Sequence, residues 1–329
     1  MTTASPLDSS SPANAGLVTL GETMGLLVAT EPGPLHRVTT LRLGMAGAES
    51  NVAIGIRRLG VDATWIGRLG TDEIGDLIER ELRAEDVRIM ARRESAPTGL
   101  MLKTLRTSDL VRVTYYRAAS AGSRLSPDDI DEEVVARAAV LHVTGITPAL
   151  GPGPAAAVRA AIESARAHDV IVSLDVNYRA ALWAPDVAAP ALRDLARQAD
   201  VLFASEDEAL LLAGAEGAGK DPVDLARQLA TYGAPQVVIK RGRHGCVALI
   251  EEQAHQCAAL PVRAVDPVGA GDAFVAGYLA DLITGQPPAT RLATANATGA
   301  FAVTVSGDWE GLPRRAELPL LHATDNVVR

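Results

Sequence analysis

The segment Asp266–Leu279, DPVGAGDAFVAGYL, decides the fold and marks a candidate site. It runs from a proline-restricted turn through three small residues into an acid at the expected start of a helix: Gly269, Ala270, Gly271 and Asp272. Free N–H groups and the positive end of a helix dipole bind anions, and glycines allow close backbone approach. Asp272 beside such an anion site could orient an alcohol and accept its proton, or could simply cap the helix. This segment alone leaves both interpretations open.

Short apolar runs alternate with helical stretches on both sides of this segment. The runs are AVLHVTG (139–145), VIVSLDVN (170–177), VLFAS (201–205), QVVIKRG (236–242) and CVALIE (246–251). Near-continuous apolar runs are typical of buried parallel strands. Helices are expected at about 154–168, 188–198, 270–284 and 288–304. This alternation predicts βαβ units.

The N-terminal part adds a second, smaller β element. After the strand-like VTLG (18–21), a helix is expected to end at Gly60. Residues 98–117 break the rhythm, because TGLMLKTLR and LVRVTYYR are strand-like runs separated by TSD, which is typical of a hairpin. We expect a β lid there, built from parts of 22–45 and 98–117. The predicted fold class is therefore α/β, with a doubly wound, mostly parallel sheet flanked by helices and a small β-strand lid.

Composition limits the partners and the domain organisation. The 329 residues contain 40 acidic and 31 basic side chains, a net charge of -9, which repels nucleic acid. Two cysteines make no disulfide framework, and no apolar run reaches the ~20 residues that span a bilayer. We expect a cytoplasmic protein with no nucleic acid or membrane partner. Its predicted parts are a disordered tail (1–16), one α/β domain (17–315) and a C-terminal tail (316–329).

Two segments resemble nucleotide-binding motifs but lack residues that these motifs need. GAEGAGKD (214–221) fits a phosphate-binding loop in part, but Asp221 stands where a Ser or Thr should bind magnesium, and a helical segment precedes it. The GAG at 269–271 begins like a dinucleotide fingerprint, but Phe274 replaces the third glycine, so a dehydrogenase is disfavoured. The six histidines form no local ligand pair, and no structural metal is predicted.

Two signatures together carry a family resemblance. DPVGAGDAFVAGYL resembles the C-terminal signature of the ribokinase-like (PfkB) family of sugar kinases. AGAESNVAIGIRRLG (46–60) resembles its N-terminal signature, although Ala46 replaces the first glycine of the usual pair. Within that family, YYR (115–117) and DVNYR (175–179) make the chain most similar to kinases of 2-keto-3-deoxygluconate. A keto acid presents a carboxylate that a guanidinium fork can grip.

The resemblance implies roles for individual residues on the sugar side. Asp272 would be the base, and the backbone of Gly269, Ala270 and Gly271 would stabilise the transferring phosphoryl group. Met101 lies where such kinases are expected to have a tyrosine. The other residues implied in substrate binding are Gly47, Asn51, Tyr115, Arg117, Asn177 and Arg179.

The resemblance also implies ATP and Mg²⁺. Glu208 would act on Mg²⁺ through water, in a SEDE segment where Ser205 replaces the usual asparagine. The residues expected to bind the nucleotide are Ser205, Lys240, Gly242, Gly245, Gly269, Gly271 and Asn296.

The expected function is transfer of the ATP γ-phosphoryl group to the terminal hydroxyl of 2-keto-3-deoxygluconate, giving the 6-phosphate. Three alternatives stay open: a kinase for fructose or ribose, a kinase for another dehydro-deoxy sugar acid, and a non-catalytic sugar-acid sensor. Exposed edges and an apolar face on the lid predict a homo-oligomer, most simply a dimer through the lids.

Overall fold

A computed structural model describes residues 16–107 and 110–322. Most of the predicted N-terminal tail (1–16) and the end of the predicted C-terminal tail (316–329) lie outside the described residues. The start of the second tail belongs to a 3-10 helix, Arg315–His322, that packs on α9 (Pro288–Ala302). No helix in the described part of the chain is both long and apolar enough to cross a bilayer.

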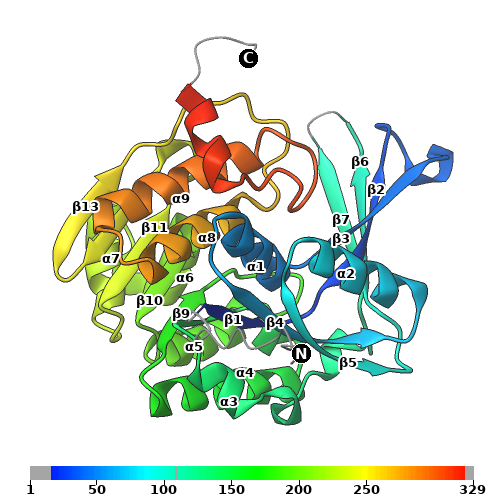
Figure 1. Cartoon of the computed structure of the whole chain (residues 1–329). Coiled ribbons are helices and arrows are strands. Elements are labelled where there is room, and N and C mark those ends of the chain that lie inside the picture. Colours follow the sequence, from blue (N-terminus) through cyan, green and yellow to red (C-terminus); the bar gives the residue numbers. More distant parts are fainter. Residues whose placement is uncertain (1–15, 108–109, 323–329) are drawn as a thin grey trace, which may run out of the picture.

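The described residues form a nine-stranded main sheet (Figure 1). The seven strands from β11 to β5 are parallel, and β12 and β13 add an antiparallel edge. The predicted doubly wound, mostly parallel sheet is therefore confirmed. In spatial order the strands are β13 (Gln253–Cys257), β12 (Cys246–Ile250), β11 (Gln236–Lys240), β10 (Val201–Ser205), β9 (Ile171–Asp175), β8 (Val140–Thr144), β1 (Leu17–Leu20), β4 (Ala63–Gly70) and β5 (Arg88–Glu94).

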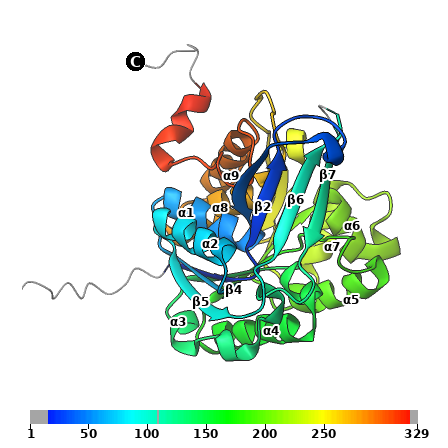
Figure 2. The same cartoon turned by 90° about the vertical axis from the view of Figure 1, so that its right-hand side faces the viewer.

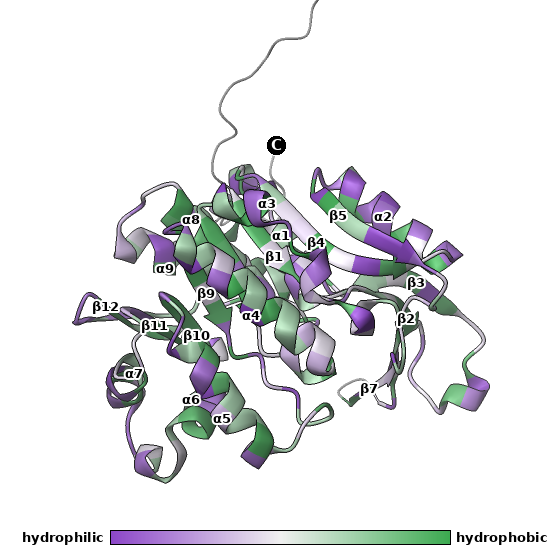
Figure 3. Ribbon diagram, turned by 90° about the horizontal axis from the view of Figure 1, so that it is seen from below, coloured by the Kyte–Doolittle hydropathy of each residue, from purple (hydrophilic) through white to green (hydrophobic). Residues whose placement is uncertain are grey.

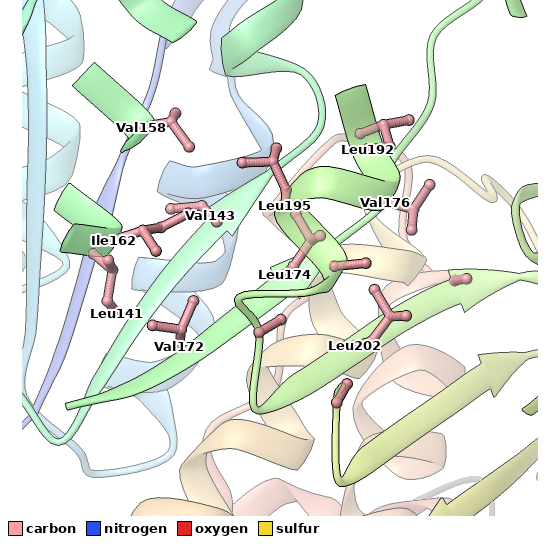
Figure 4. Packing of buried hydrophobic residues seen from close by; sticks show 14 of the residues in the cluster. Leu141, Val143, Val158, Ile162, Val172, Leu174, Val176, Leu192, Leu195 and Leu202 are labelled. Carbon is pink, nitrogen blue, oxygen red and sulfur yellow. The ribbon is translucent and has the colours of Figure 1, made fainter. Parts of the chain in front are cut away.

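Helices cover both faces of this sheet and bury a separate apolar layer on each. One face carries α1 (Ala48–Arg58), α2 (Glu73–Ala84), α8 (Ala270–Ile283) and α9. The other carries α3 (Glu132–Ala136), α4 (Pro152–Ala167), α5 (Pro185–Ala196), α6 (Glu206–Ala213) and α7 (Pro222–Ala230). Figure 4 shows Leu141, Leu174 and Leu202 pointing from strands of this second face toward helix side chains such as Ile162. Truncating one such leucine to alanine costs ~2–5 kcal/mol.

Local sequence signals set several helix ends. Asp72 precedes α2 and its side chain accepts a hydrogen bond from the backbone N–H of Gly75. In Figure 3, hydrophilic and hydrophobic turns alternate along α2, because only one of its faces packs inward. Asp221 caps α7 in the same way, so GAEGAGKD links two helices and is not a phosphate loop after a strand.

A second sheet of four strands stands beside the main sheet, as Figure 2 shows for β2, β6 and β7. Its order is β3 (Leu41–Ala46), β2 (Met24–Ala29), β6 (Leu100–Leu105) and β7 (Val111–Tyr116). The β6–β7 pair is antiparallel, as predicted for the hairpin, although residues 108–109 of its turn lie outside the described part. We call this second sheet the lid sheet.

Candidate active site

A cavity of about 440 Å³ lies between the lid sheet and the carboxyl ends of the parallel strands. Asp175, Ser205 and Lys240 end β9, β10 and β11 and line it, as expected for a site at the carboxyl edge of an open α/β sheet. The lid sheet contributes residues of β2, β6 and β7 to the opposite wall. The cavity therefore lies where a substrate can contact both sheets.

The turn before α8 has the geometry that anion binding requires. Gly269 precedes the helix with φ of 76°, and a Cβ there would lie 1.8 Å from the carbonyl oxygen of Asp308, so only glycine fits. Among the described residues, no backbone carbonyl accepts a hydrogen bond from the N–H groups of Gly271 and Asp272. These N–H groups are available to an anion at the helix N-terminus.

Asp272 is buried in this first turn and shares one amide with a second buried acid. Asn51 Nδ2 donates to Asp272 Oδ2 at 2.9 Å and to Asp308 Oδ2 at 3.0 Å. Burial and the charge of Asp308 raise the pKa of Asp272 to about 7, although the Asn51 hydrogen bond opposes the shift. Burial likewise raises the pKa of Asp308 to about 6. An aspartate whose pKa lies near neutrality is suited to general base catalysis.

Asn177 lies on the other side of Asp272. Its Nδ2 is 3.5 Å from Asp272 Oδ1, and its backbone has a positive φ of 38°. It follows Asp175, both of whose carboxylate oxygens lie 2.7 Å from Lys240 Nζ. Burial alone lowers the pKa of Lys240, but Asp175 and Glu208 reverse this and raise it above its usual value. Lys240 therefore keeps its charge at the carboxyl edge of the sheet.

Two arginines that the sequence analysis assigned to acid recognition both line the cavity. They differ in their ion pairing. The Arg117 guanidinium follows β7 and is ion-paired with the buried Glu22, with Nε at 2.8 Å and Nη2 at 2.6 Å from Oε2. It also lies 5.7 Å from the centroid of the Tyr115 ring. Arg179 is exposed and, in the described part of the chain, has no acidic partner within ion-pair distance. The charge of Arg179 is therefore not neutralised by an acidic partner, whereas the guanidinium of Arg117 is held in one orientation by Glu22.

A second cavity, of about 620 Å³, adjoins the first and shares Lys240, Gly242, Pro267 and Gly271 with it. Its wall is mostly apolar and includes Phe274. A nucleoside triphosphate fits this arrangement, because its base can occupy the apolar cavity while its phosphates reach the turn before α8. Gly245 and Asn296 also line this second cavity, and Asn296 Nδ2 donates to the carbonyl oxygens of Cys257 and Ala258.

The residues at the site can bind Mg²⁺ only together with the phosphates of a nucleotide. Glu208 lines the first cavity, but its two carboxylate oxygens accept hydrogen bonds from the backbone N–H groups of Ser205 (2.7 Å) and Tyr178 (2.9 Å). Each oxygen keeps a further lone pair for a water of the ion. No group of three or more metal-ligating side chains occurs among the residues described. Mg²⁺ usually binds through one or two carboxylates, several waters and substrate phosphates, so a single carboxylate such as that of Glu208 is sufficient.

The structure brings the sequence-derived candidates to these two adjoining cavities. The first is lined by Gly47, Asn51, Tyr115, Arg117, Asn177, Arg179, Ser205, Glu208, Lys240, Gly242, Gly269, Gly271 and Asp272. The second is lined by Gly245, Ala270 and Asn296, along with some of these. Met101 also lines the first cavity, from β6.

Five charged residues at the site were missed from the sequence: Glu22, Glu49, Lys103, Asp175 and Asp308. Asp175 stands inside DVNYR, where its place at a strand end was a usable signal. Asp308 follows α9 in an irregular segment with no periodic pattern, and nothing in the sequence placed it beside Asp272.

Comparison with known proteins gives a consistent result. Residues 14–315 match the pfkB family of carbohydrate kinases. The chain is 37% identical over 317 residues to a 2-dehydro-3-deoxygluconokinase of Bacillus subtilis, covering 94% of this chain and 96% of that one. It is 37% identical to a 2-dehydro-3-deoxygluconokinase of Thermoproteus tenax, covering 92% of each chain. It is 33% identical to a 2-dehydro-3-deoxygalactonokinase of Haloferax volcanii, covering 89% of this chain and 92% of the other.

Solved structures agree with the fold. The 2-dehydro-3-deoxygluconokinase of Thermotoga maritima is 26% identical, with a TM-score of 0.86 and coverage of 93% of this chain and 99% of that one. A ribokinase-II-type protein of E. coli in complex with ATP and Mg²⁺ is also 26% identical, with a TM-score of 0.86 and coverage of 94% and 99%. The predicted ribokinase-like fold is confirmed by both.

Proposed function

The chain belongs to the pfkB family of carbohydrate kinases, and we propose that its acceptor is the terminal hydroxyl of 2-keto-3-deoxygluconate, which it converts to the 6-phosphate. As a member of that family it is a phosphotransferase that uses ATP and Mg²⁺ on an alcohol acceptor. The observation that supports this acceptor is a single cavity with Asp272 at the start of α8 and two arginines, Arg117 and Arg179, in its walls.

In this proposal Asp272 removes the proton of the acceptor hydroxyl. Its pKa of about 7 leaves much of it ionised at neutral pH and still basic enough to accept a proton. Asn51 holds Asp272 by its amide nitrogen, and its buried Oδ1, which has no partner in the described part of the chain, can accept a hydrogen bond from a sugar hydroxyl. The carboxylate and the acceptor are thereby held in one orientation.

The turn before α8 stabilises the charge of the transferring group. The free N–H groups of Gly271 and Asp272 and the dipole of α8 face the place where this charge develops. Lys240 adds a positive charge at the same edge, since a Cβ on Gly271 would lie 3.6 Å from its Nζ. Glu208 would hold Mg²⁺ through water, and the bound ion would neutralise part of the phosphate charge.

The two arginines hold the carboxylate end of the acceptor. Arg117 shares its charge with Glu22, which fixes its direction and lowers its net attraction for an anion. Arg179 has the uncompensated charge, so we assign it most of the attraction for the acid. A neutral sugar gives these two side chains nothing to neutralise.

A coupled ADP-release assay with Mg-ATP tests the proposal. The acceptors are 2-keto-3-deoxygluconate, its galactonate epimer, fructose and ribose, and mass spectrometry confirms the product. We expect a preference for the two deoxy keto acids; the galactonate epimer is included because one relative is a 2-dehydro-3-deoxygalactonokinase. A preference for fructose or ribose would overturn the role of the arginines, and inactivity on all four would favour a sensor.

We further propose that two chains associate through their lid sheets. Leu43 and Tyr116 lie on the face of the lid sheet away from the cavity and are 49% and 60% exposed. Exposed apolar patches mark interaction sites. Size-exclusion chromatography with light scattering should give twice the chain mass, and Leu43→Glu should reduce it to one chain. A single-chain mass for the parent at micromolar concentration would refute this.

We also propose a cytoplasmic location, because ATP is the phosphoryl donor and both cysteines are free. Cell fractionation checks it, and recovery of the protein outside the cytoplasm would refute it.

A further inference from the structure

The ion pair between Lys103 and Asp266 is almost completely buried, and no step of the chemistry described so far uses it. Lys103, in the middle of β6, contacts Asp266 Oδ2 through its Nζ, and the two side chains are only 4% and 7% exposed. Asp266 opens the turn that leads into α8. The pair therefore joins the lid sheet to the anion-binding turn across 163 residues of sequence.

Asp266 also holds two segments of the main domain. Its Oδ1 accepts a hydrogen bond from the N–H of Val268 at 3.2 Å, inside the turn before Gly269. Its Oδ2 accepts one from the N–H of Gly307 at 3.3 Å, next to Asp308. A single carboxylate thus connects the lid strand, the turn before α8 and the loop that carries Asp308.

Charge balance at this point depends on Lys103. Asp266, Asp272 and Asp308 are all buried. Asp272 and Asp308 line the cavity together with Lys103. The charge of Lys103 helps to lower the pKa of Asp308, against the larger effect of burial. A buried ion pair is a weak source of stability, because desolvation offsets most of the attraction. Its position where three functional segments meet therefore calls for another explanation.

We propose that Lys103 is a positioning residue: through Asp266 it fixes the turn before α8 and the Asp308 loop relative to the lid sheet, in the arrangement that phosphoryl transfer needs. The inference rests on the kinase activity of the family and not on which sugar is the acceptor. A displacement of about 1 Å at a reacting centre can cost ~10²-fold in rate. Lys103 acts here without contacting the acceptor.

The variant Lys103→Met tests this, with Arg106→Met as its matched control. Arg106 directly follows β6, is exposed and does not line the cavity, so its loss removes the same charge away from the site. We expect Lys103→Met to lower kcat by roughly 10²-fold while the KM values for ATP and sugar change little. Arg106→Met should leave all three constants at parent values. A raised KM for the sugar with normal kcat would make Lys103 a substrate contact and overturn the proposal.

Hydrogen–deuterium exchange supplies a readout that needs no acceptor. In Lys103→Met the amides of 266–272 and 304–310 should exchange faster, whereas those of α4 should not change. Inactivity of the parent enzyme on every sugar would defeat the proposed function but leave this measurement intact. Unchanged exchange in both segments would overturn the positioning role.

The double variant Lys103→Met/Asp266→Asn separates positioning from stability. It removes the unpaired buried carboxylate, so its thermal midpoint should recover toward that of the parent. Without the ion pair, kcat should stay low. Recovery of kcat in step with the thermal midpoint would show a purely structural role and refute the inference.

Discussion

Replacing Asp272 by asparagine should make the protein more stable and the enzyme nearly inactive. The carboxylate is buried beside Asp308, and its pKa in the fold is about 7, against 3.8 for an unperturbed aspartate. At about 1.4 kcal/mol per unit, this shift of about three units corresponds to at most ~4 kcal/mol. Asparagine keeps the shape and can still accept the hydrogen bond of Asn51, but it carries no charge.

The raised pKa of Asp272 makes the stability of the protein depend on pH, and this dependence can be measured. A raised pKa means that the folded protein binds this proton more tightly than the unfolded chain, so the contribution to stability is present below pH 3.8 and is lost as the pH rises to about 7. Asp272→Asn escapes this loss. Its unfolding free energy from urea titration should therefore exceed that of the parent by a margin that grows from pH 5 to pH 8.

Activity should move the opposite way. Without the proposed base, kcat should fall roughly 10²-fold or more, with both KM values largely retained. Asp281→Asn is the control, because it makes the same change in the same helix but removes the ion pair with Arg315, and it should lower stability. Near-parent kcat in Asp272→Asn, or a stability margin that does not grow with pH, would refute the assignment.

Three further predictions concern the same cavity. Arg179→Ala should raise the KM for the keto acid far more than the KM for ATP, and equal effects in steady-state kinetics would point to misfolding. Asn51→Leu removes the hydrogen bond that opposes the raised pKa of Asp272 and Asp308, so the acid limb of the kcat/KM profile, expected near pH 7 in the parent, should move to higher pH; an unmoved limb would exclude Asp272 as the titrating base. Gly269→Ala places a Cβ against the backbone of Asp308 at positive φ, and the thermal midpoint should fall by several degrees, whereas Gly285→Ala, at positive φ in open space, should cost less.

Much of the fold could be predicted from the sequence because the buried strands and helices have strong periodic patterns. The strands from β8 to β12 coincide with apolar runs, and α8 and α9 lie within about two residues of their predicted bounds. The edge strands β5 and β13 were missed. Their sequences, RIMARRE and QAHQC, are polar because one side of an edge strand faces solvent, so neither the apolar-run pattern nor turn residues identified them.

The site divides in the same way. Asp272 and its glycines could be found because they stand consecutively in one segment that is typical of an anion-binding helix start and that resembles a family signature. Asp308 and the Lys103–Asp266 pair could not, since their partners are distant in sequence and are brought together only by the packing of the lid sheet and the loop after α9. The ion pairing of Arg117 could not be predicted either, because its partner Glu22 lies 95 residues away, in the connection after β1.

Asn51 and Asp272 lie 221 residues apart and belong to helices that pack directly on each other, α1 and α8. During synthesis, the segment with Asn51 leaves the ribosome long before the helix with Asp272, the proposed base, exists. A growing chain that ends before residue 270 has no anion-binding turn and no Asp272. The complete proposed catalytic centre therefore forms only after the last helices dock, and unfinished chains cannot consume ATP by the proposed chemistry.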